Sequence, residues 1–229
     1  MAKIALILGG GDGTRAGGPL PKQFQEIGGK SVLRRSVEAF LKVDPATKVY
    51  VVVHPSFLEE WDSEVQEIAR EYGAEVTVVC GGKSRWHSVG NGLLMARDCG
   101  MSAGDIVAVH DGARPLVAAS VIEAGWKCAE QNGTAVPAVP LTDSIRRVGK
   151  DGKSESVRRS DYVAVQTPQV FRTEIINDAY SRPYSPVFTD DASVVEAAGY
   201  GIHLYSGSPL NIKITNPLDF KIAALILGE

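Results

Sequence analysis

Residues 8–23, LGGGDGTRAGGPLPKQ, set the interpretation of the whole chain. The aliphatic run at residues 4–8, IALIL, leads directly into them and is typical of a short buried strand closed by glycines. Glycines permit positive φ angles and close approach of the backbone to a ligand, and successive N–H groups in such a loop form an anion cradle. Arg15 and Lys22 place two cations on the same loop. The stretch therefore predicts a phosphate-binding loop. Its cradle glycines are Gly9, Gly10, Gly11 and Gly13.

Two common phosphate-binding motifs do not account for this loop. Residues 11–16 match the relaxed dinucleotide fingerprint, but that motif needs a helix to open within its glycines, and the glycines and prolines of residues 17–21 would break one. Gly-Lys-Ser occurs at residues 29–31 and 82–84, yet the earlier glycine that a P-loop requires is missing in both places. The arrangement that fits is a long glycine loop with an Arg and, seven residues later, a Lys, as in sugar-nucleotide-forming nucleotidyltransferases.

Composition places the chain among ordinary globular proteins. It has 229 residues, of which 44% are hydrophobic and 22% charged, and a net charge of −3, so it lacks the basic surplus of a nucleic-acid-binding protein. No apolar run approaches the roughly 18 residues of a membrane span, and the N-terminus lacks a signal-peptide pattern. We therefore expect a cytoplasmic protein. Three cysteines without a C-x-x-C pair, Cys80, Cys99 and Cys128, are expected to be buried free thiols.

Strands and helices are expected to alternate through the first 140 residues. That alternation predicts an α/β fold with a mostly parallel twisted sheet and helices on both faces, within a single domain over residues 1–229. The expected strands are 4–8, 48–53, 75–80, 106–110, 134–139, 163–171, 202–205 and 212–214. The expected helices are 31–41, 56–72 with a capping box at Ser56, 86–99, 118–131, 174–180 capped by Thr173, one that is capped by residues 189–191 and runs to 198, and a last one starting at Asn216-Pro217.

The pattern changes at residue 141. Two strand-like polar runs, 142–148 and 154–159, flank an Asp-Gly turn, which predicts a β-hairpin. It is too polar for the core, so it either projects into solvent or packs on another subunit. Because isolated two-stranded hairpins are marginally stable, residues 141–160 are interpreted as a dimerisation arm.

Polar residues collect where ligands bind to open parallel sheets, beyond the carboxyl ends of strands. Asp111 follows a buried strand; it is either a turn or cap residue or a ligand of Mg²⁺, which prefers carboxylate and phosphate oxygens. Arg114 either forms a surface ion pair or binds a phosphate. Lys213, in an apolar segment, either points to solvent or meets an anion. Arg15 and Lys22 are solvated loop cations in the alternative interpretation, but two cations beside a glycine cradle favour anion binding.

Five separated blocks, in order, resemble the 2-C-methyl-D-erythritol 4-phosphate cytidylyltransferase family over nearly the whole chain. The blocks are the glycine loop at 8–24, GGKSRWHSV at 81–89, HDGARP at 110–115, Arg159 followed by QTPQVF at 166–171, and NIKIT at 211–215. The resemblance implies a three-layer Rossmann-like nucleotidyltransferase fold with a projecting hairpin arm. It also implies a Mg²⁺-dependent (or other divalent cation-dependent) enzyme that forms a homodimer and uses CTP and a sugar-alcohol phosphate as substrates.

Residue roles follow from the matched positions. Arg15 and Lys22 would stabilise the charge on the triphosphate, and Asp111 would help to hold Mg²⁺. Gly82 and Ser88, with Lys83 beside them, would contact the nucleotide. The residues that would position the acceptor, with Arg114 beside them, are Ser144, Arg159, Thr167 and Lys213, and the first two would enter the partner subunit's site from the arm.

The motifs differ slightly from those of the family, and two alternative functions stay open. The motif Gly-Gly-Gly-x-Gly-Thr-Arg is also similar to that of the related ribitol 5-phosphate cytidylyltransferases, whereas Arg159 favours the methylerythritol family. A non-catalytic nucleotide-binding regulator is the other alternative; the intact Arg15, Lys22 and Asp111 argue against it.

Overall fold

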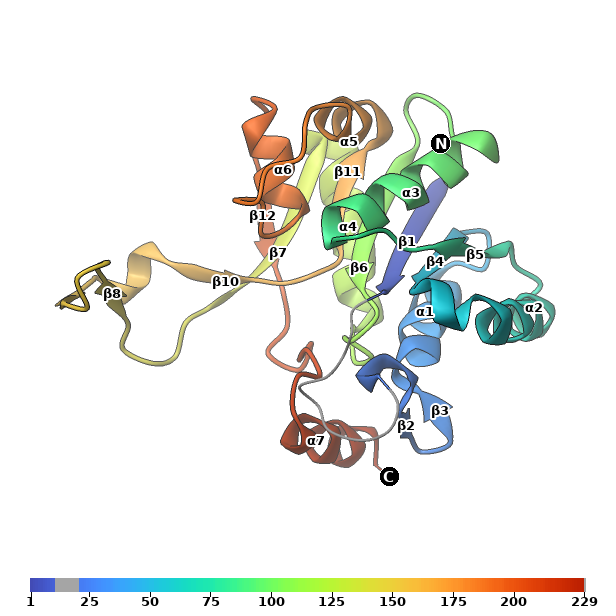
Figure 1. The fold of residues 1–229 in the computed structure, drawn as a ribbon, viewed down its shortest axis with the longest axis horizontal. Helices are drawn as coiled ribbons and strands as arrows, with labels where there is room; N and C mark the ends of the chain where they lie inside the picture. Colours follow the sequence, from blue (N-terminus) through green and yellow to red (C-terminus); the bar gives the residue numbers. More distant parts are fainter. Residues whose placement is uncertain (11–20, 229) are drawn as a thin grey trace.

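The computed structural model describes residues 1–10 and 21–228. Within them, an eight-stranded sheet has the order β10-β7-β11-β6-β1-β4-β5, with β12 paired to β7 (Figure 1). Its strands are β1 (Lys3–Gly9), β4 (Lys48–Val53), β5 (Val76–Cys80), β6 (Ile106–Asp111), β7 (Thr134–Pro140), β10 (Val163–Val165), β11 (Gln169–Arg172) and β12 (Leu204–Ser206).

The sheet is mostly parallel, as predicted. β1 pairs in parallel with both β4 and β6, and β4 pairs in parallel with β5. β11 runs antiparallel to its two neighbours, β6 and β7, so β7 has the direction of β6. β12 is parallel to β7, and β10 is antiparallel to it. The carboxyl ends of β5, β4, β1 and β6 therefore meet at one edge of the sheet.

Helices cover both faces, because successive side chains of a buried strand point to opposite sides. In β1, Ala5 and Ile7 belong to the core cluster under one helical layer, whereas Ile4 and Leu6 belong to the cluster under the other. The first layer contains α1 (Val32–Val43), α2 (Leu58–Tyr72) and α4 (Ala119–Asn132). The second contains α3 (Arg85–Asp98), α5 (Thr173–Tyr180) and α6 (Asp191–Ala197). This confirms the expected three layers.

The C-terminal helix α7 (Pro217–Leu227) packs below the sheet beside a small hairpin of β2 (Glu26–Ile27) and β3 (Lys30–Ser31) (Figure 1). Asn216 caps this helix with a capping box, and proline occupies its first turn, as predicted. The small hairpin was not expected, because strands of two residues show no periodicity.

The predicted polar hairpin is present as β8 (Arg146–Val148) and β9 (Ser154–Ser156), which are shorter than expected. All residues of both strands are exposed. Figure 1 shows the hairpin at the far end of a long extension that leaves the sheet between β7 and β10.

Two strand predictions were wrong. The expected strand 163–171 is two strands, which end and begin around Gln166 and Thr167. There the Gln166 side chain donates to the carbonyl of Ser208, and Thr167 accepts from the Asn211 side chain and from the Asp111 N–H at the end of β6. The expected strand 212–214 is irregular, and its backbone is held by the N–H of Ile214, which donates to the carbonyl of Ala113 at 2.8 Å. Apolar runs of three residues do not separate a strand from a buried connection.

Two helix caps were also wrong. Pro55 starts a 3₁₀ turn, η3 (Pro55–Phe57), and His54 caps that turn through Nδ1, which accepts from the Ser56 N–H at 3.2 Å. The turn leads directly into α2, so Ser56 does not act as its capping residue. Thr173 is the first residue of α5, and its hydroxyl donates instead to the carbonyl of Ser102 at 2.9 Å.

The cysteines are free, as predicted, but the expected burial was wrong. Cys80 ends the edge strand β5 and Cys99 follows the last turn of α3, so both are exposed, and Cys128 is half-buried. No helix within residues 1–10 and 21–228 is long and apolar enough to cross a membrane.

Candidate active site

The loops at the carboxyl edge of the sheet are tied to one another through backbone hydrogen bonds. The Gly81 N–H donates to the carbonyl of Val53 at 2.7 Å, and the Gly112 N–H donates to the carbonyl of Leu8 at 2.9 Å. A Cβ on Gly112 would lie 2.9 Å from that carbonyl oxygen, so a side chain there would disturb the contact. The close packing brings the segments after β1, β5 and β6 to one place.

The glycine loop begins at the end of β1. Gly9 is buried, and its carbonyl accepts a 2.7 Å hydrogen bond from Nε2 of the buried Gln23. This bond joins the start of the loop to its end, where Lys22 opens the 3₁₀ helix η2 (Lys22–Phe24). Gly10 is half-buried beside the Ser88 side chain. Gly11, Gly13 and Arg15 lie outside the described residues, so their predicted roles stay predictions.

The second glycine loop leads into α3. Gly82 donates its N–H to Oγ of Ser88 at 3.0 Å, while Ser84 caps the helix. A Cβ on Gly82 would lie 2.4 Å from Cβ of His87, so only glycine fits there. Lys83 is exposed on this loop. The predicted nucleotide-contacting residues Gly82 and Ser88 thus bond directly to each other.

Asp111, the last residue of β6, is surrounded by three cations. Its Oδ2 lies 2.8 Å from Nζ of Lys213 and 3.5 Å from Nε of Arg114, and its Oδ1 lies 3.7 Å from Nε of Arg85. Burial favours the neutral acid, but Arg85, Lys213 and Arg114 outweigh it and hold the pKa of Asp111 well below its usual range. The carboxylate is therefore ionised at neutral pH.

A buried hydrogen-bond chain fixes the backbone at Asp111. The Asp111 N–H donates to Oγ1 of Thr167 at 3.0 Å, and Thr167 Oγ1 lies 3.1 Å from Nδ1 of His110. His110 Nε2 lies 3.2 Å from the carbonyl of Arg114, which can only accept. The proton of His110 is therefore on Nε2, and Nδ1 accepts from the Thr167 hydroxyl. Burial, the largest effect, lowers the pKa of His110 to about 4, so the ring is neutral.

The same region ties the segment after β12 to the site. Arg114 donates through Nη1 to the carbonyl of Asn211 at 2.8 Å, and Asn211 Nδ2 donates to the carbonyl of Thr167 at 2.8 Å. Asn211 is fully buried. These bonds explain why Lys213, two residues later, reaches Asp111.

Two predicted site residues lie elsewhere in this chain. Ser144 and Arg159 are exposed on the arm, where Arg159 donates a hydrogen bond to the carbonyl of Thr142. The arm extends away from the sheet (Figure 1). The structure thus brings Asp111, Arg114, Thr167 and Lys213 together, and it does not bring the two arm residues to them.

The ion pair of Arg85 and Asp191, which lies beside Asp111, was not predicted from the sequence. Arg85 Nη1 and Nη2 donate to Oδ1 and Oδ2 of Asp191 at 2.8 and 2.6 Å, next to Asp111. A signal was present in the sequence, because an arginine directly after the cap Ser84 places a cation at a helix N-terminus, where the helix dipole disfavours it. An arginine in this position is expected to pair with a carboxylate.

The donor set at Asp111 fits a divalent cation that is shared with phosphates. The described residues contain no group of three or more His, Cys, Asp or Glu side chains that could hold a metal. A single ionised carboxylate matches Mg²⁺, which commonly takes one or two protein carboxylates together with substrate phosphates and water. A cation here would therefore be held mainly by its nucleotide.

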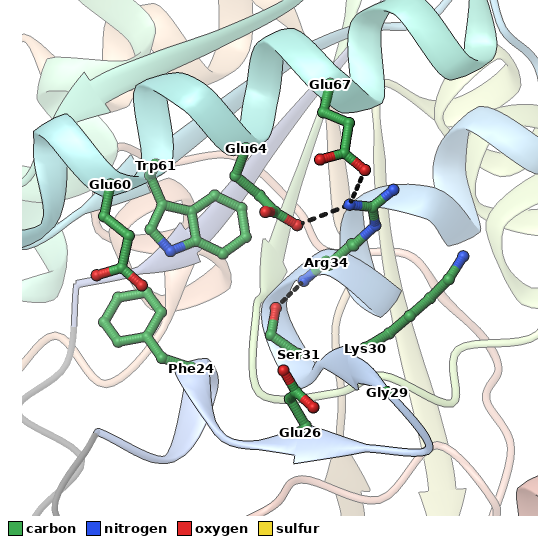
Figure 2. A pocket seen from close by; sticks show the side chains of 10 residues that line it. All are labelled: Phe24, Glu26, Gly29, Lys30, Ser31, Arg34, Glu60, Trp61, Glu64 and Glu67. Carbon is green, nitrogen blue, oxygen red and sulfur yellow. Dashed lines mark hydrogen bonds and ion pairs between the residues drawn. The ribbon is translucent and has the colours of Figure 1, made fainter.

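A pocket of about 370 Å³ lies away from these residues, between the β2–β3 hairpin and α2 (Figure 2). Phe24 and Trp61 form one side of it, and Glu64 and Glu67 point from α2 toward Arg34 (Figure 2). Arg34 also pairs with Glu38 and Glu71, so this guanidinium is fully neutralised. None of the predicted site residues lines the pocket.

The parallel sheet, the glycine loop that follows its first strand, and the carboxylate ringed by cations define a nucleotidyltransferase. The model of the family described as 2-C-methyl-D-erythritol 4-phosphate cytidylyltransferase matches residues 3–229, and this chain belongs to that family. The match confirms the family and the enzyme class predicted from the sequence.

Relatives and solved structures agree with this assignment. The chain is 41% identical over 227 residues to the 2-C-methyl-D-erythritol 4-phosphate cytidylyltransferase of Bacteroides thetaiotaomicron, covering 99% of this chain and 100% of that protein. It is 42% identical over 228 residues to the Porphyromonas gingivalis protein of the same name, covering 98% and 97%. The crystal structure of the Thermus thermophilus enzyme of that name superposes with a TM-score of 0.74 at 29% identity over the full length of both chains.

Proposed function

We propose that this protein transfers CMP from CTP to 2-C-methyl-D-erythritol 4-phosphate, which yields 4-diphosphocytidyl-2-C-methyl-D-erythritol and pyrophosphate. One observation carries the proposal. Asp111 is held among Arg85, Arg114 and Lys213 at the sheet edge where the glycine loop begins. Arg85 is also paired with Asp191, so Lys213 and Arg114 are the cations that suit a reaction between two phosphate groups, in a chain whose net charge is negative.

The reaction is an in-line displacement. A phosphate oxygen of the acceptor forms a bond to the α-phosphorus of CTP, and the bond from that phosphorus to the bridging oxygen of pyrophosphate breaks, with its electron pair leaving on pyrophosphate. The protein contributes position and charge and needs no nucleophile of its own. Arg15 and Lys22 stabilise the charge that develops on the triphosphate.

The nucleotide is assigned to the two glycine loops. Gly9, Gly10, Gly11 and Gly13 supply backbone N–H groups to the phosphates, and Gly82 and Ser88, with Lys83 beside them, contact the nucleoside. The absence of room for a Cβ on Gly82 supports a role for its backbone.

The acceptor is assigned to Lys213, Arg114 and Thr167 of one subunit. Thr167 Oγ1 donates to His110 and accepts from the Asp111 N–H, which leaves one lone pair for an acceptor hydroxyl. Ser144 and Arg159 complete this site from the arm of the partner in a homodimer. Support for the dimer comes from the edge strand at the base of the arm, where Tyr162, Val163 and Val165 are 45–47% exposed.

Asp111 would hold Mg²⁺ or another divalent cation together with the phosphates of CTP. When bound, that cation supplies positive charge to the phosphates. Asp111 itself stays ionised, and the hydrogen bonds of its own N–H and of His110 keep its backbone in place. We assign the protein to the cytoplasm, consistent with its three free cysteines.

The experiment is pyrophosphate release from CTP and Mg²⁺ with methylerythritol phosphate and ribitol phosphate as parallel acceptors. Release with methylerythritol phosphate alone is expected. Pyrophosphate release with ribitol phosphate alone would support the cytidylyl transfer but contradict the proposed acceptor. CTP binding without pyrophosphate release with either acceptor would favour the non-catalytic regulator.

A further inference from the structure

Arg85 lies between two carboxylates, and it binds them unequally. Its Nη1 and Nη2 donate to both oxygens of Asp191 at 2.8 and 2.6 Å, whereas only its Nε faces Asp111, at 3.7 Å. We propose that Asp191 is a positioning residue of the cytidylyl-transfer site. By binding the guanidinium of Arg85, it keeps the carboxylate of Asp111 available to the divalent cation that arrives with the nucleotide. This inference rests on the proposed function.

The contacts of Asp191 are those of a residue built to hold a guanidinium. Its side chain is completely buried, and Oδ1 also accepts a 2.6 Å hydrogen bond from the Tyr180 hydroxyl. A buried carboxylate is costly unless it is paired and hydrogen-bonded, and the planar guanidinium matches a carboxylate through two parallel bonds. Asp191 is therefore the preferred partner of Arg85.

A capping role does not explain Asp191. The cap of α6 is Asp190, whose Oδ1 accepts from the Ser193 N–H at 2.9 Å in a reciprocal capping box. Asp191 comes one residue later, and its side chain bonds with α3 and α5 instead. Its link to the site through Arg85 remains to be explained.

The charges around Asp111 supply the explanation. Lys213 and Arg114 also approach Asp111, and in the proposed reaction both serve the phosphates. A third unneutralised cation would compete with a metal ion for the Asp111 oxygens, because like charges disfavour each other at this distance. Asp191 neutralises that third cation and holds its two Nη groups away.

The test measures Mn²⁺ binding to the enzyme–CTP complex by electron paramagnetic resonance, with inorganic phosphate in place of the acceptor phosphate that draws Lys213 and Arg114 from Asp111. The metal dependence of pyrophosphate release is measured alongside. In Asp191→Asn, Arg85 is released toward Asp111. We expect Mn²⁺ binding about tenfold weaker, the lower end of the effect of residues that support a metal ligand. The metal concentration for half-maximal release should rise by the same factor, with kcat at saturating metal within about threefold.

Two variants separate this role from a structural one. Tyr180→Phe removes the other hydrogen bond of Asp191 and leaves the Arg85 pair, so its Mn²⁺ affinity should match the wild type even where its melting temperature falls. Arg85→Gln removes the competing cation, so it should bind Mn²⁺ at least as tightly as the wild type, and adding it to Asp191→Asn should restore affinity.

Wild-type affinity in Asp191→Asn, or weakened affinity in Arg85→Gln, would overturn the proposal. If Asp191→Asn alone does not fold, the double variant, which removes both charges of the pair, decides. It should bind Mn²⁺ as the wild type does, and weaker binding would overturn the proposal. If the wild type releases no pyrophosphate with either acceptor but the Mn²⁺ affinities behave as described, the proposed acceptor reaction fails while the role of Asp191 stands.

Discussion

Nζ of Lys213 lies 2.8 Å from Oδ2 of Asp111, which joins a residue near the C-terminus to the end of the central strand β6. The segment that carries Lys213 is irregular and is held by the bond from the Ile214 N–H to the carbonyl of Ala113. The backbone that carries the Lys213 side chain is therefore held in place, so the fold itself brings the ammonium group to Asp111. In the proposed reaction, Lys213 turns between this carboxylate and a phosphate.

Lys213→Gln keeps the length and polarity of the side chain and removes its charge. We expect kcat/KM for the acceptor to fall by about 10²–10³, the scale for loss of one preorganised charge-stabilising group. Steady-state pyrophosphate release measures it, with the exposed Lys127→Gln as the matched control. Equal kinetics in the two variants would remove Lys213 from the acceptor site.

Lys22→Ala and Arg15→Ala should each reduce turnover by about 10²–10³, because each removes positive charge from the triphosphate as it is attacked. The measurement is kcat at saturating CTP and acceptor. CTP binding by equilibrium titration distinguishes lost binding from lost catalysis. Turnover near the wild-type value in both variants would exclude these cations from the mechanism.

Thr167→Val removes a hydroxyl that bonds with the Asp111 N–H and with His110 Nδ1. Both of these buried groups then lose a hydrogen-bond partner. We expect the free energy of unfolding to fall by about 1–3 kcal/mol per unsatisfied group. Urea unfolding measures this, and Thr167→Ser, which keeps the hydroxyl, should retain most of the stability. A Val variant as stable as the Ser variant would show that the chain of hydrogen bonds does not stabilise the fold.

Acidification should destabilise the protein through His110. Burial lowers its folded-state pKa from the ordinary 6.5 to about 4, so the unfolded state binds more protons between these values. The contribution of His110 is fully present above pH 6.5 and is lost as the pH falls toward 4. Unfolding free energies across this range should show the decline, with a shallower slope for His110→Gln. The same slope in both proteins would contradict a neutral buried ring.

Subunit mixing tests the arm. If Arg159 serves the partner's site, a heterodimer of Lys22→Ala and Arg159→Ala subunits has one doubly defective site and one intact site. Random pairing of equal amounts should therefore restore roughly a quarter of wild-type activity from two inactive proteins. Co-expressed and separately expressed variants are compared by pyrophosphate release. Activity that stays at the level of the separate variants would place Arg159 in its own subunit's site.

The sequence by itself determined the layered α/β fold and the edge of the sheet at which the polar residues gather. Aliphatic strands alternating with amphipathic helices have few alternatives to a covered parallel sheet, and side chains that follow such strands collect at one edge. Asp111, Arg114 and the glycines could therefore be placed on that edge from local pattern alone.

Tertiary structure decided what local pattern does not encode. The partners of Arg85 come from α6 and β6, and no spacing in the sequence links Arg85 to Asp191 and Asp111. The same holds for the strand predicted at 163–171, which is divided where Gln166 and Thr167 bond with Asn211 and His110. Hydrogen bonds between distant segments outweigh short-range preference in such places, because a buried polar group must find a partner wherever the fold provides one.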